Sequence, residues 1–200
     1  APTAVPAPAA VPTAVPASAV AGGGFRRLWS APSTLDPHLT SDTTSRGVVV
    51  EVFSGLVALS PDLELIPDIA AGWEVSPDGL QYTFHLREHA TFHNGKPVTA
   101  QDFKWSIERA ASPDTGSPVA DTYLNDIIGV QDVLDGRTTD ISGIQVIDDH
   151  TLRIDIDAPK AYFLAKLTYP IAYVLDQENV ESGGRLWTDT PNGTGPFILR

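Results

Sequence analysis

The chain contains neither cysteine nor methionine, and it has 13 Lys and Arg against 25 Asp and Glu, a net charge of −12. Without cysteine, it can form no disulfide and no thiol-based catalytic site. The negative charge disfavours nucleic-acid backbones and anionic membranes, so we expect no nucleic acid among the partners. No apolar run approaches the roughly 18 residues that a membrane-spanning helix needs.

The start of the chain also lacks the marks of an export signal. It begins at Ala1, with no charged-then-apolar signal peptide, so we interpret it as processed or cloned without that signal. Residues 1–24 are of low complexity, because the sequence PTAVPA at residues 2–7 recurs at 12–17. Prolines favour polyproline II and the Gly triplet at 22–24 is a flexible joint, so we predict a disordered linker or tether, with an ordinary disordered terminus as the alternative.

The most strongly patterned stretch is residues 70–103. Residues 76–79 (Ser-Pro-Asp-Gly) contain the proline and glycine of a turn. Residues 80–87 then alternate apolar and polar side chains with the period of a half-buried strand. Thr99 and Asp102 have the spacing of a helix capping box. This stretch therefore predicts a turn, a strand and the start of a helix.

Further elements are predicted on both sides of this stretch. In chain order they are a weak strand over residues 25–30, an extended segment over 63–69, a helix over 121–134 interrupted near Gly129, a hairpin over 143–157, a short helix over 160–168 and a glycine-rich turn into a strand over 193–199. Residues 48–59 are ambiguous, because their valines favour a strand whereas the apolar spacing fits a helix capped by Asp42 or Thr43. Strands and helices mix without regular alternation, which predicts a mixed α/β fold rather than a doubly wound one.

A set of motifs follows one order along the chain. They are LDPH at residues 35–38, FSGL at 53–56, the patterned stretch at 70–103, ASPD at 111–114 with Ser-Pro at 117–118, DDHTL at 148–152 and GTGPF at 193–197. In order and spacing, they resemble the extracytoplasmic solute-binding proteins of ABC importers, in the branch that binds dipeptides, oligopeptides, nickel and some oligosaccharides. The Ser-Pro spacing resembles the oligopeptide-binding subgroup in particular.

The resemblance implies a two-lobed, periplasmic-binding-protein-like fold, with a hinge between the lobes and the ligand enclosed by both. Residues 25–200 would be the N-terminal part of the first lobe, with about 48–179 as its extra subdomain. Family members are considerably longer than this chain, which is therefore expected to stop while the first lobe is still being built. The resemblance also favours the helix over residues 48–59, which we predict.

The same resemblance implies function and location. The protein would be no enzyme and would use no cofactor; as a monomer it would capture peptides outside the cytoplasmic membrane and deliver them to the permease of an ABC transporter. We expect it in the periplasm or on the outer face of that membrane, with a possible lipid anchor upstream of Ala1. The alternatives are a nickel or oligosaccharide receptor of the same family and, in other classes, a secreted hydrolase or a tethered adhesion module.

The resemblance places the ligand beside the loop that precedes the first motif. The residues carried over are Trp29, Ser30, Ala31, Pro32, Ser33 and Thr34, whose backbone could pair with an extended peptide like an added strand. Val119 and Tyr123, after the Ser-Pro pair, are further candidates. Residues 30–34 include no acidic side chain, unlike the oligopeptide-binding pattern, and this leaves the type of ligand open.

Other constellations of reactive side chains favour structural interpretations. His85, His89 and His93 would share a face only on a helix; on the strand predicted here they lie too far apart for one metal ion, so we expect no metal site. Asp36 and His38 could form at most half of a catalytic triad, and we interpret Asp36 as a turn cap. No Gly-x-Ser-x-Gly elbow is present, so the sequence shows no competent nucleophile.

Overall fold

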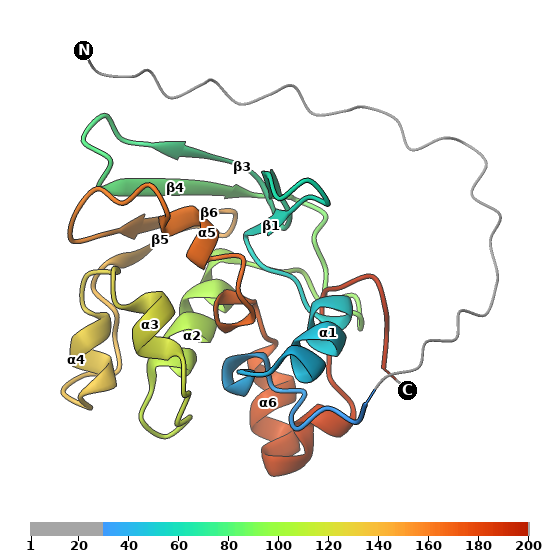
Figure 1. The fold of residues 1–200 in the computed structure, drawn as a ribbon. Helices are drawn as coiled ribbons and strands as arrows, with labels where there is room; N and C mark the ends of the chain where they lie inside the picture. The colour runs from blue at the N-terminus through green and yellow to red at the C-terminus, as the bar shows by residue number, and fades with distance from the viewer. Residues whose placement is uncertain (1–29, 200) are drawn as a thin grey trace, which may run out of the picture.

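The computed structural model describes residues 30–199, which fold around an antiparallel sheet with helices on one side (Figure 1). The predicted linker over residues 1–24, most of the predicted strand over 25–30 and the candidate ligand residue Trp29 lie outside this range. No helix within residues 30–199 has the length and apolar character needed to cross a membrane. The mixed α/β class predicted from the sequence is confirmed.

The four-stranded sheet has the order β3-β4-β6-β5. Its strands are β3 (Ala70–Val75), β4 (Gln81–Leu86), β5 (Ile144–Asp148) and β6 (Thr151–Asp155). The turn between β3 and β4 is confirmed at residues 76–79, where Gly79 has a φ of 73° that suits glycine. The hairpin predicted over residues 143–157 forms β5 and β6. Along β4, Tyr82, Phe84 and Leu86 are buried in the alternation that the sequence predicts.

The helix α2 (Ala100–Ala111) confirms the capping box. The Thr99 hydroxyl oxygen accepts from the Asp102 amide at 3.3 Å, and the Asp102 carboxylate accepts from the Thr99 amide at 2.8 Å. Its buried face includes Phe103 and Ile107. The predicted interruption of the next helix is also confirmed, because Gly129 has a φ of 88° and separates α3 (Ala120–Leu124) from α4 (Val130–Leu134).

The remaining helical segments follow the sheet in the chain. They are α5 (Phe163–Lys166), which is shorter than the predicted helix over 160–168, then η2 (Pro170–Ala172), α6 (Gln177–Gly183) and η3 (Gly184–Asp189). In Figure 1, α2, α3 and α4 lie on one side of the sheet, whereas α1 and α6 lie beyond its end. A large apolar core joins the sheet to α2, α3 and α4, and a smaller one holds Phe53 and Trp187.

The helix predicted over residues 48–59 is wrong in its second half. The helix α1 (Thr43–Val52) begins at the predicted cap, Asp42, but Phe53 is extended, with φ −124° and ψ 158°. Residues Val57–Leu59 form β1, which pairs with β2 (Leu65–Pro67) inside the segment predicted to be extended. Leu59, the last member of the expected helical stripe, is 45% exposed. The other members of the stripe are buried, Val49 and Val52 on α1 and Phe53 and Leu56 beyond its end. The spacing therefore predicted burial correctly but not a continuous helix.

The strand predicted over residues 193–199 is also wrong, because none forms there within the described part of the chain. The segment instead binds the end of α1: the Gly195 amide donates to Val52 O at 2.8 Å, and the Phe197 amide to Glu51 O at 3.0 Å. A Cβ atom on Gly193 would collide with Val52 O, so this close approach requires glycine. The GTGPF motif thus fastens residues 193–197 to α1.

Candidate ligand-binding site

The loop of residues 30–34 rests on the first turn of α1. Ser30, Ala31 and Ser33 are exposed. The amides of Ser33 and Thr34 donate to the Ser45 hydroxyl oxygen at 3.0 and 3.3 Å. The interpretation that these two amides are free to bind a peptide is therefore wrong, because Ser45 already accepts both. Hydrogen bonds to α1 therefore fix the conformation of this loop.

Asp42, the N-cap residue of α1, also binds this loop. The Asp42 carboxylate accepts from the Ser45 amide at 2.8 Å, and its other oxygen accepts from the Ser33 hydroxyl at 2.8 Å. These bonds, led by the one from the Ser45 amide, lower the pKa of Asp42 to about 2. Asp42 therefore stays ionised over the physiological pH range and caps α1 while it orients Ser33.

The loop continues into a buried cluster of charged side chains. Asp36 caps η1 (Pro37–Leu39) and accepts from the His38 amide at 2.9 Å, which confirms the predicted turn cap. The Arg109 guanidinium, from α2, donates to both oxygens of Asp36, at 3.2 and 2.6 Å. Because a guanidinium only donates, the Arg109–His38 contact at 2.8 Å requires an unprotonated Nδ1, and Nε2–H then donates to Tyr173 O at 3.3 Å. Both ring nitrogens of His38 are engaged, so neither is free to accept a proton from a catalytic nucleophile.

Burial keeps His38 neutral. The ring is fully buried, and this desolvation lowers its pKa from 6.5 to about 4. The nearby Arg109 charge lowers the pKa further, while the Asp36 carboxylate and the bond to Tyr173 oppose both effects. A neutral imidazole is the form that the contact with Arg109 needs, so geometry and electrostatics agree.

The two candidates that follow the Ser-Pro pair lie on α3. Val119 is the N-cap residue of α3 and packs, half-buried, on the main core. Tyr123 stacks on Tyr169, with ring centroids 4.1 Å apart and an interplanar angle of 15°. The Tyr169 hydroxyl donates to Thr40 O at 3.3 Å, and the guanidinium of Arg46 lies 5.7 Å from the Tyr169 ring centroid. The structure therefore brings Tyr123, but not Val119, into a chain of contacts that reaches α1.

Sequence reasoning missed Ser45, Arg46 and Tyr169, the residues that connect the loop to α3. Ser45 and Arg46 carry no motif of their own, and their partners lie far away in the sequence. The nearest signal was the cap at Asp42, which predicts the start of α1 and hence the position of Ser45 three residues later. Tyr169 had no such signal.

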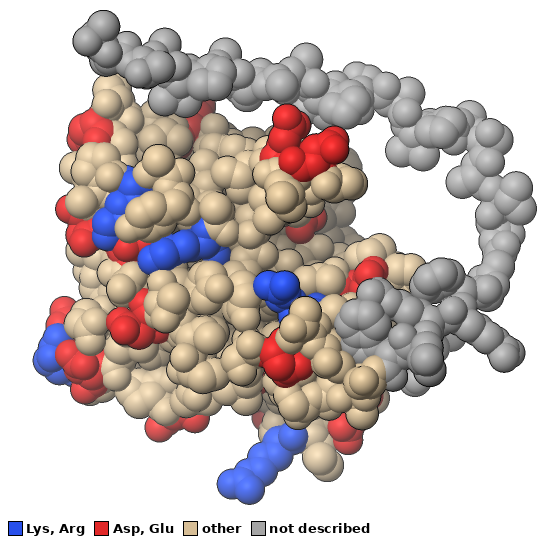
Figure 2. All heavy atoms as spheres, in the orientation of Figure 1, with Lys and Arg blue, Asp and Glu red and all other residues tan. Residues whose placement is uncertain are grey.

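A hollow of about 400 Å³ opens beside these contacts. Its walls come from α1, β1 and the segment before η2, and they include Arg46, Val50, Asp68, Tyr169 and Tyr173. Apolar and polar side chains share these walls, as in small-molecule sites. In Figure 2, Lys and Arg side chains lie across the middle of this face of the molecule.

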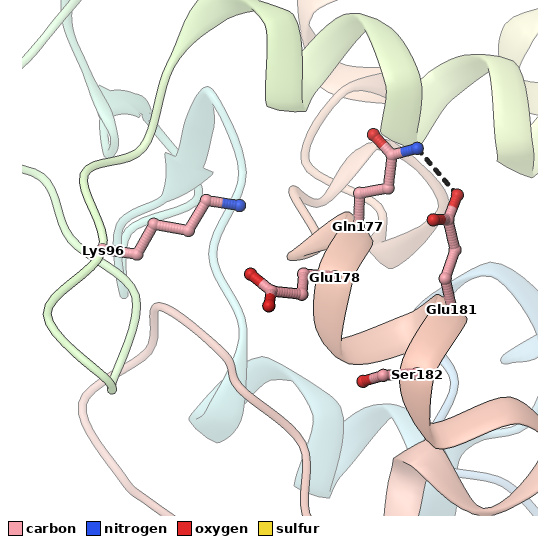
Figure 3. Close-up of a pocket in the computed structure, with 5 residues that line it drawn as sticks. All are labelled: Lys96, Gln177, Glu178, Glu181 and Ser182. Atoms are coloured by element: carbon pink, nitrogen blue, oxygen red, sulfur yellow. Dashed lines mark hydrogen bonds between the residues drawn. The ribbon is translucent and has the colours of Figure 1, made fainter.

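A second hollow, of about 510 Å³, lies between the turn of Lys96 and α6. Figure 3 shows the Lys96 amine and the Glu178 carboxylate extending toward the same space from opposite sides. Lys96 already pairs with Asp176 at 2.6 Å and Asp102 at 3.6 Å. This hollow contains no aromatic side chain, unlike the one beside Tyr169, so we place the candidate ligand site elsewhere.

The three histidines weighed as metal ligands have other surroundings. His85 lies 3.5 Å from Glu74, and His89 is exposed. The Nε2 atom of His93 is 2.9 Å from Gly195 O, which ties the turn after β4 to the C-terminal segment. Across residues 30–199, no cluster of three or more His, Cys, Asp or Glu side chains is arranged to hold a metal ion.

Comparison with known proteins gives one consistent result. The model of the bacterial extracellular solute-binding proteins, family 5 Middle, matches residues 64–200. The periplasmic oligopeptide-binding protein OppA of Escherichia coli K12 is 34% identical over 181 residues, which cover 88% of this chain and 33% of OppA. The chain thus spans about a third of the length of the curated relatives it matches.

Solved structures share the fold. The murein tripeptide binding protein MppA of Escherichia coli superposes with a TM-score of 0.81 at 35% identity, over 86% of this chain and 34% of MppA. Listeria monocytogenes OppA bound to peptide gives a TM-score of 0.78 at 28% identity, over 83% of this chain and 34% of that one. The mixed α/β fold is therefore that of periplasmic binding proteins, of which the chain covers a part consistent with one lobe.

Proposed function

This chain belongs to family 5 of the bacterial extracellular solute-binding proteins, and from this premise we propose that it is part of a peptide receptor for an ABC importer. Such a receptor captures its ligand by lobe closure and hands it to a membrane permease. Relatives named as oligopeptide-binding, and a relative solved with bound peptide, support a peptide as the ligand. Residues 25–200 would supply the N-terminal part of the first lobe, with about residues 48–179 as its extra subdomain.

The site would have the loop of residues 30–34 as one wall. The observation that carries this assignment is the support beneath the loop: Ser45 and Asp42 fix its amides and hydroxyl while Ser30, Ala31 and Ser33 remain exposed. A rigid, exposed loop gives an extended ligand a surface that costs little ordering on binding. Further contacts would come from the residues predicted with it, Trp29, Pro32, Thr34, Val119 and Tyr123.

The protein would be a receptor rather than an enzyme. Both ring nitrogens of His38 are occupied, so the one Asp–His pair weighed as part of a triad lacks a free base. The relatives that the chain matches are named as binding proteins. We propose a monomer outside the cytoplasmic membrane, with residues 1–24 as a tether to an anchor upstream of Ala1.

Peptide titration of the full-length protein tests this function. We expect calorimetry with a pool of short peptides to give micromolar affinity or better, whereas residues 1–200 alone should bind very weakly. The reason is that a ligand held by both lobes leaves many of its polar groups unpaired when one lobe is absent. A full-length protein that binds nickel or an oligosaccharide, and no peptide, would contradict the proposal.

The residue before the loop, Trp29, is tested by its replacement with alanine in the full-length protein. Because we propose that its ring contacts the peptide, the variant should bind about tenfold more weakly, or by roughly 1.4 kcal/mol. Tyr162→Ala is a matched control, because Tyr162 is 54% exposed on a different segment. Equal affinity of the Trp29 variant and the control, both folded, would place the cleft elsewhere.

A further inference from the structure

We propose that the hollow beside Tyr169 is a side-chain pocket that selects peptides with an acidic residue, and that Arg46 is its specificity-determining residue. The inference rests on the proposed peptide-binding function and adds the chemistry of the ligand. It is carried by three observations: a cation that forms no ion pair within residues 30–199, the aromatic ring beside it, and the position of this cation on the helix that supports the proposed cleft wall.

Arg46 is a cation with no carboxylate partner in the described part of the chain. Its side chain is exposed on the first turn of α1, and none of the ion pairs formed within residues 30–199 includes it. Arg109 and Arg137, in contrast, each bind at least one aspartate. The nearby Asp42 carboxylate is engaged by Ser33 and Ser45. The positive charge of Arg46 is thus available to a ligand.

The surroundings of the Arg46 guanidinium favour the binding of a ligand. Its guanidinium lies 5.7 Å from the centroid of the Tyr169 ring, which Tyr123 in turn supports by stacking. An arginine that rests on an aromatic ring loses less freedom when it binds a ligand, and its planar fork matches a carboxylate in a bidentate way. A carboxylate is therefore the group that this arrangement recognises best.

The hollow has the size and walls for a side chain. Its volume of about 400 Å³ exceeds what one side chain needs, so a ligand residue can enter together with water. Val50 and Leu59 are 40% and 45% exposed, and as lining residues they offer apolar surface to the methylene groups of a long acidic side chain. Glutamate combines such methylenes with a terminal carboxylate.

Asp68 is the acidic residue in the same lining, and it could instead attract a basic side chain. Its carboxylate already accepts from the Gly55 amide at 3.3 Å. Burial raises its pKa, which a bond from Gly55, a bond from Ser54 and the charge of Arg87 oppose. Asp68 is thus half-buried and already accepts a hydrogen bond, whereas Arg46 is exposed and has no ion-pair partner among residues 30–199. The outer part of the hollow therefore favours an anion.

The hollow and the proposed cleft wall share α1. Arg46 directly follows Ser45, which holds the loop of residues 30–34, and the Tyr169 hydroxyl binds Thr40 O at 3.3 Å. A peptide lying along the loop would therefore place one of its side chains next to Arg46. The hollow beside Lys96, in contrast, is lined by no residue of α1.

The test measures the affinity of the full-length protein for matched peptides by calorimetry. An alanine-based tripeptide series carries Glu, Gln or Lys at each position in turn. We expect a preference of about tenfold for Glu over its neutral isostere Gln at one position, weakening as salt is added. Arg46→Gln should remove this preference while affinity for the Gln peptide changes less than twofold, and Arg46→Lys should retain part of it.

Arg137→Gln is the control for the loss of one positive charge, because Arg137 is exposed and lies in the turn that follows α4. It should keep the full preference for Glu. Equal binding of Glu and Gln peptides at every position, or a preference for Lys, overturns the inference and leaves the proposed function standing. Binding of no peptide at all overturns both.

Discussion

The guanidinium of Arg109 and the carboxylate of Asp36 form a bidentate pair across 73 positions of the sequence, at 3.2 and 2.6 Å. The pair joins the segment after the candidate loop to the end of α2. The Asp36 side chain is 5% exposed and that of Arg109 is 17% exposed, so water competes little for these two hydrogen bonds. The position of the loop therefore depends on a helix that follows it by more than sixty residues.

Replacing Arg109 with leucine should destabilise the protein strongly. Removing one partner leaves the buried Asp36 charge uncompensated, which costs about 3–5 kcal/mol in comparable pairs. The variant also loses the contact of Arg109 with the Trp187 ring, whose centroid is 5.6 Å away. Urea unfolding of the intact protein measures the change. Arg137→Leu, at an exposed site, should cost less than 1 kcal/mol, and an equally small cost for Arg109→Leu would contradict the role assigned to the pair.

Stability should fall as the pH decreases from about 6.5 to 4. The unfolded chain protonates His38 at its ordinary pKa near 6.5, whereas the folded protein does so only near 4. Between these values the unfolded state binds more protons, so the contribution is complete above 6.5 and is lost as the pH falls to 4. The loss should reach up to about 3 kcal/mol.

His38→Gln is the matched variant for this pH dependence. Glutamine offers an amide donor and an acceptor oxygen without titrating, so the slope of stability between pH 4 and 6.5 should become flatter. Chemical unfolding at a series of pH values measures both proteins. The same slope in the variant would show that other groups, and not His38, cause the acid sensitivity.

Local rules predicted much of the fold. The capping box of Thr99 and Asp102 and the turn at residues 76–79 depend only on neighbouring residues, and both formed as predicted. The failures came from tertiary contacts. Residues 53–59 leave the helix because β1 pairs with β2, and residues 193–199 bind the end of α1 instead of forming a strand.

The candidate site was less predictable than the fold. The family resemblance indicated a loop, but it contained no information about the partners of that loop. Ser45 accepts from two amides that lie 12 and 11 positions earlier, and Tyr169 binds Thr40 from 129 positions away. No periodicity or motif encodes such pairs, so the use of the Ser33 and Thr34 amides was mispredicted.

Replacing Thr99 with alanine should cost about 1 kcal/mol. The variant loses the side-chain acceptor for the Asp102 amide at the start of α2, and helix caps of this kind contribute about that much. Thermal unfolding of the intact protein measures the shift. Thr122→Ala, at an exposed position of α3, should change stability by less than 0.5 kcal/mol, and an equal effect of the two variants would argue against a capping role.

Replacing Ser45 with alanine should weaken peptide binding more than it weakens the fold. The variant removes the acceptor of the Ser33 and Thr34 amides, so the loop loses its fixed shape. We expect a roughly tenfold loss of affinity in the full-length protein, or about 1.4 kcal/mol. Ser182→Ala, at an exposed position of α6, is the control. Unchanged peptide affinity in the folded Ser45 variant would exclude the loop from the cleft wall.

Replacing Gly193 with alanine should be strongly destabilising. The added Cβ would collide with Val52 O, and relief requires the segment to move away from α1, at a cost of about 3 kcal/mol. Gly72→Ala is the control, because a Cβ there meets no atom within 4 Å. Circular dichroism during urea unfolding compares the two. Similar stabilities would mean that the contact with α1 is not needed for the fold.

The C-terminal segment has a consequence for how the protein is made. Thr194, Gly195 and Asn192 bind Ser54, His93 and Asn94, which precede them by 140, 102 and 98 positions. A ribosome adding 5–20 residues per second needs roughly 5–30 seconds to cover that interval. During this time α1 and the turn after β4 have left the ribosome without the segment that fastens them. During synthesis, these two elements therefore lack their C-terminal hydrogen-bond partners for several seconds.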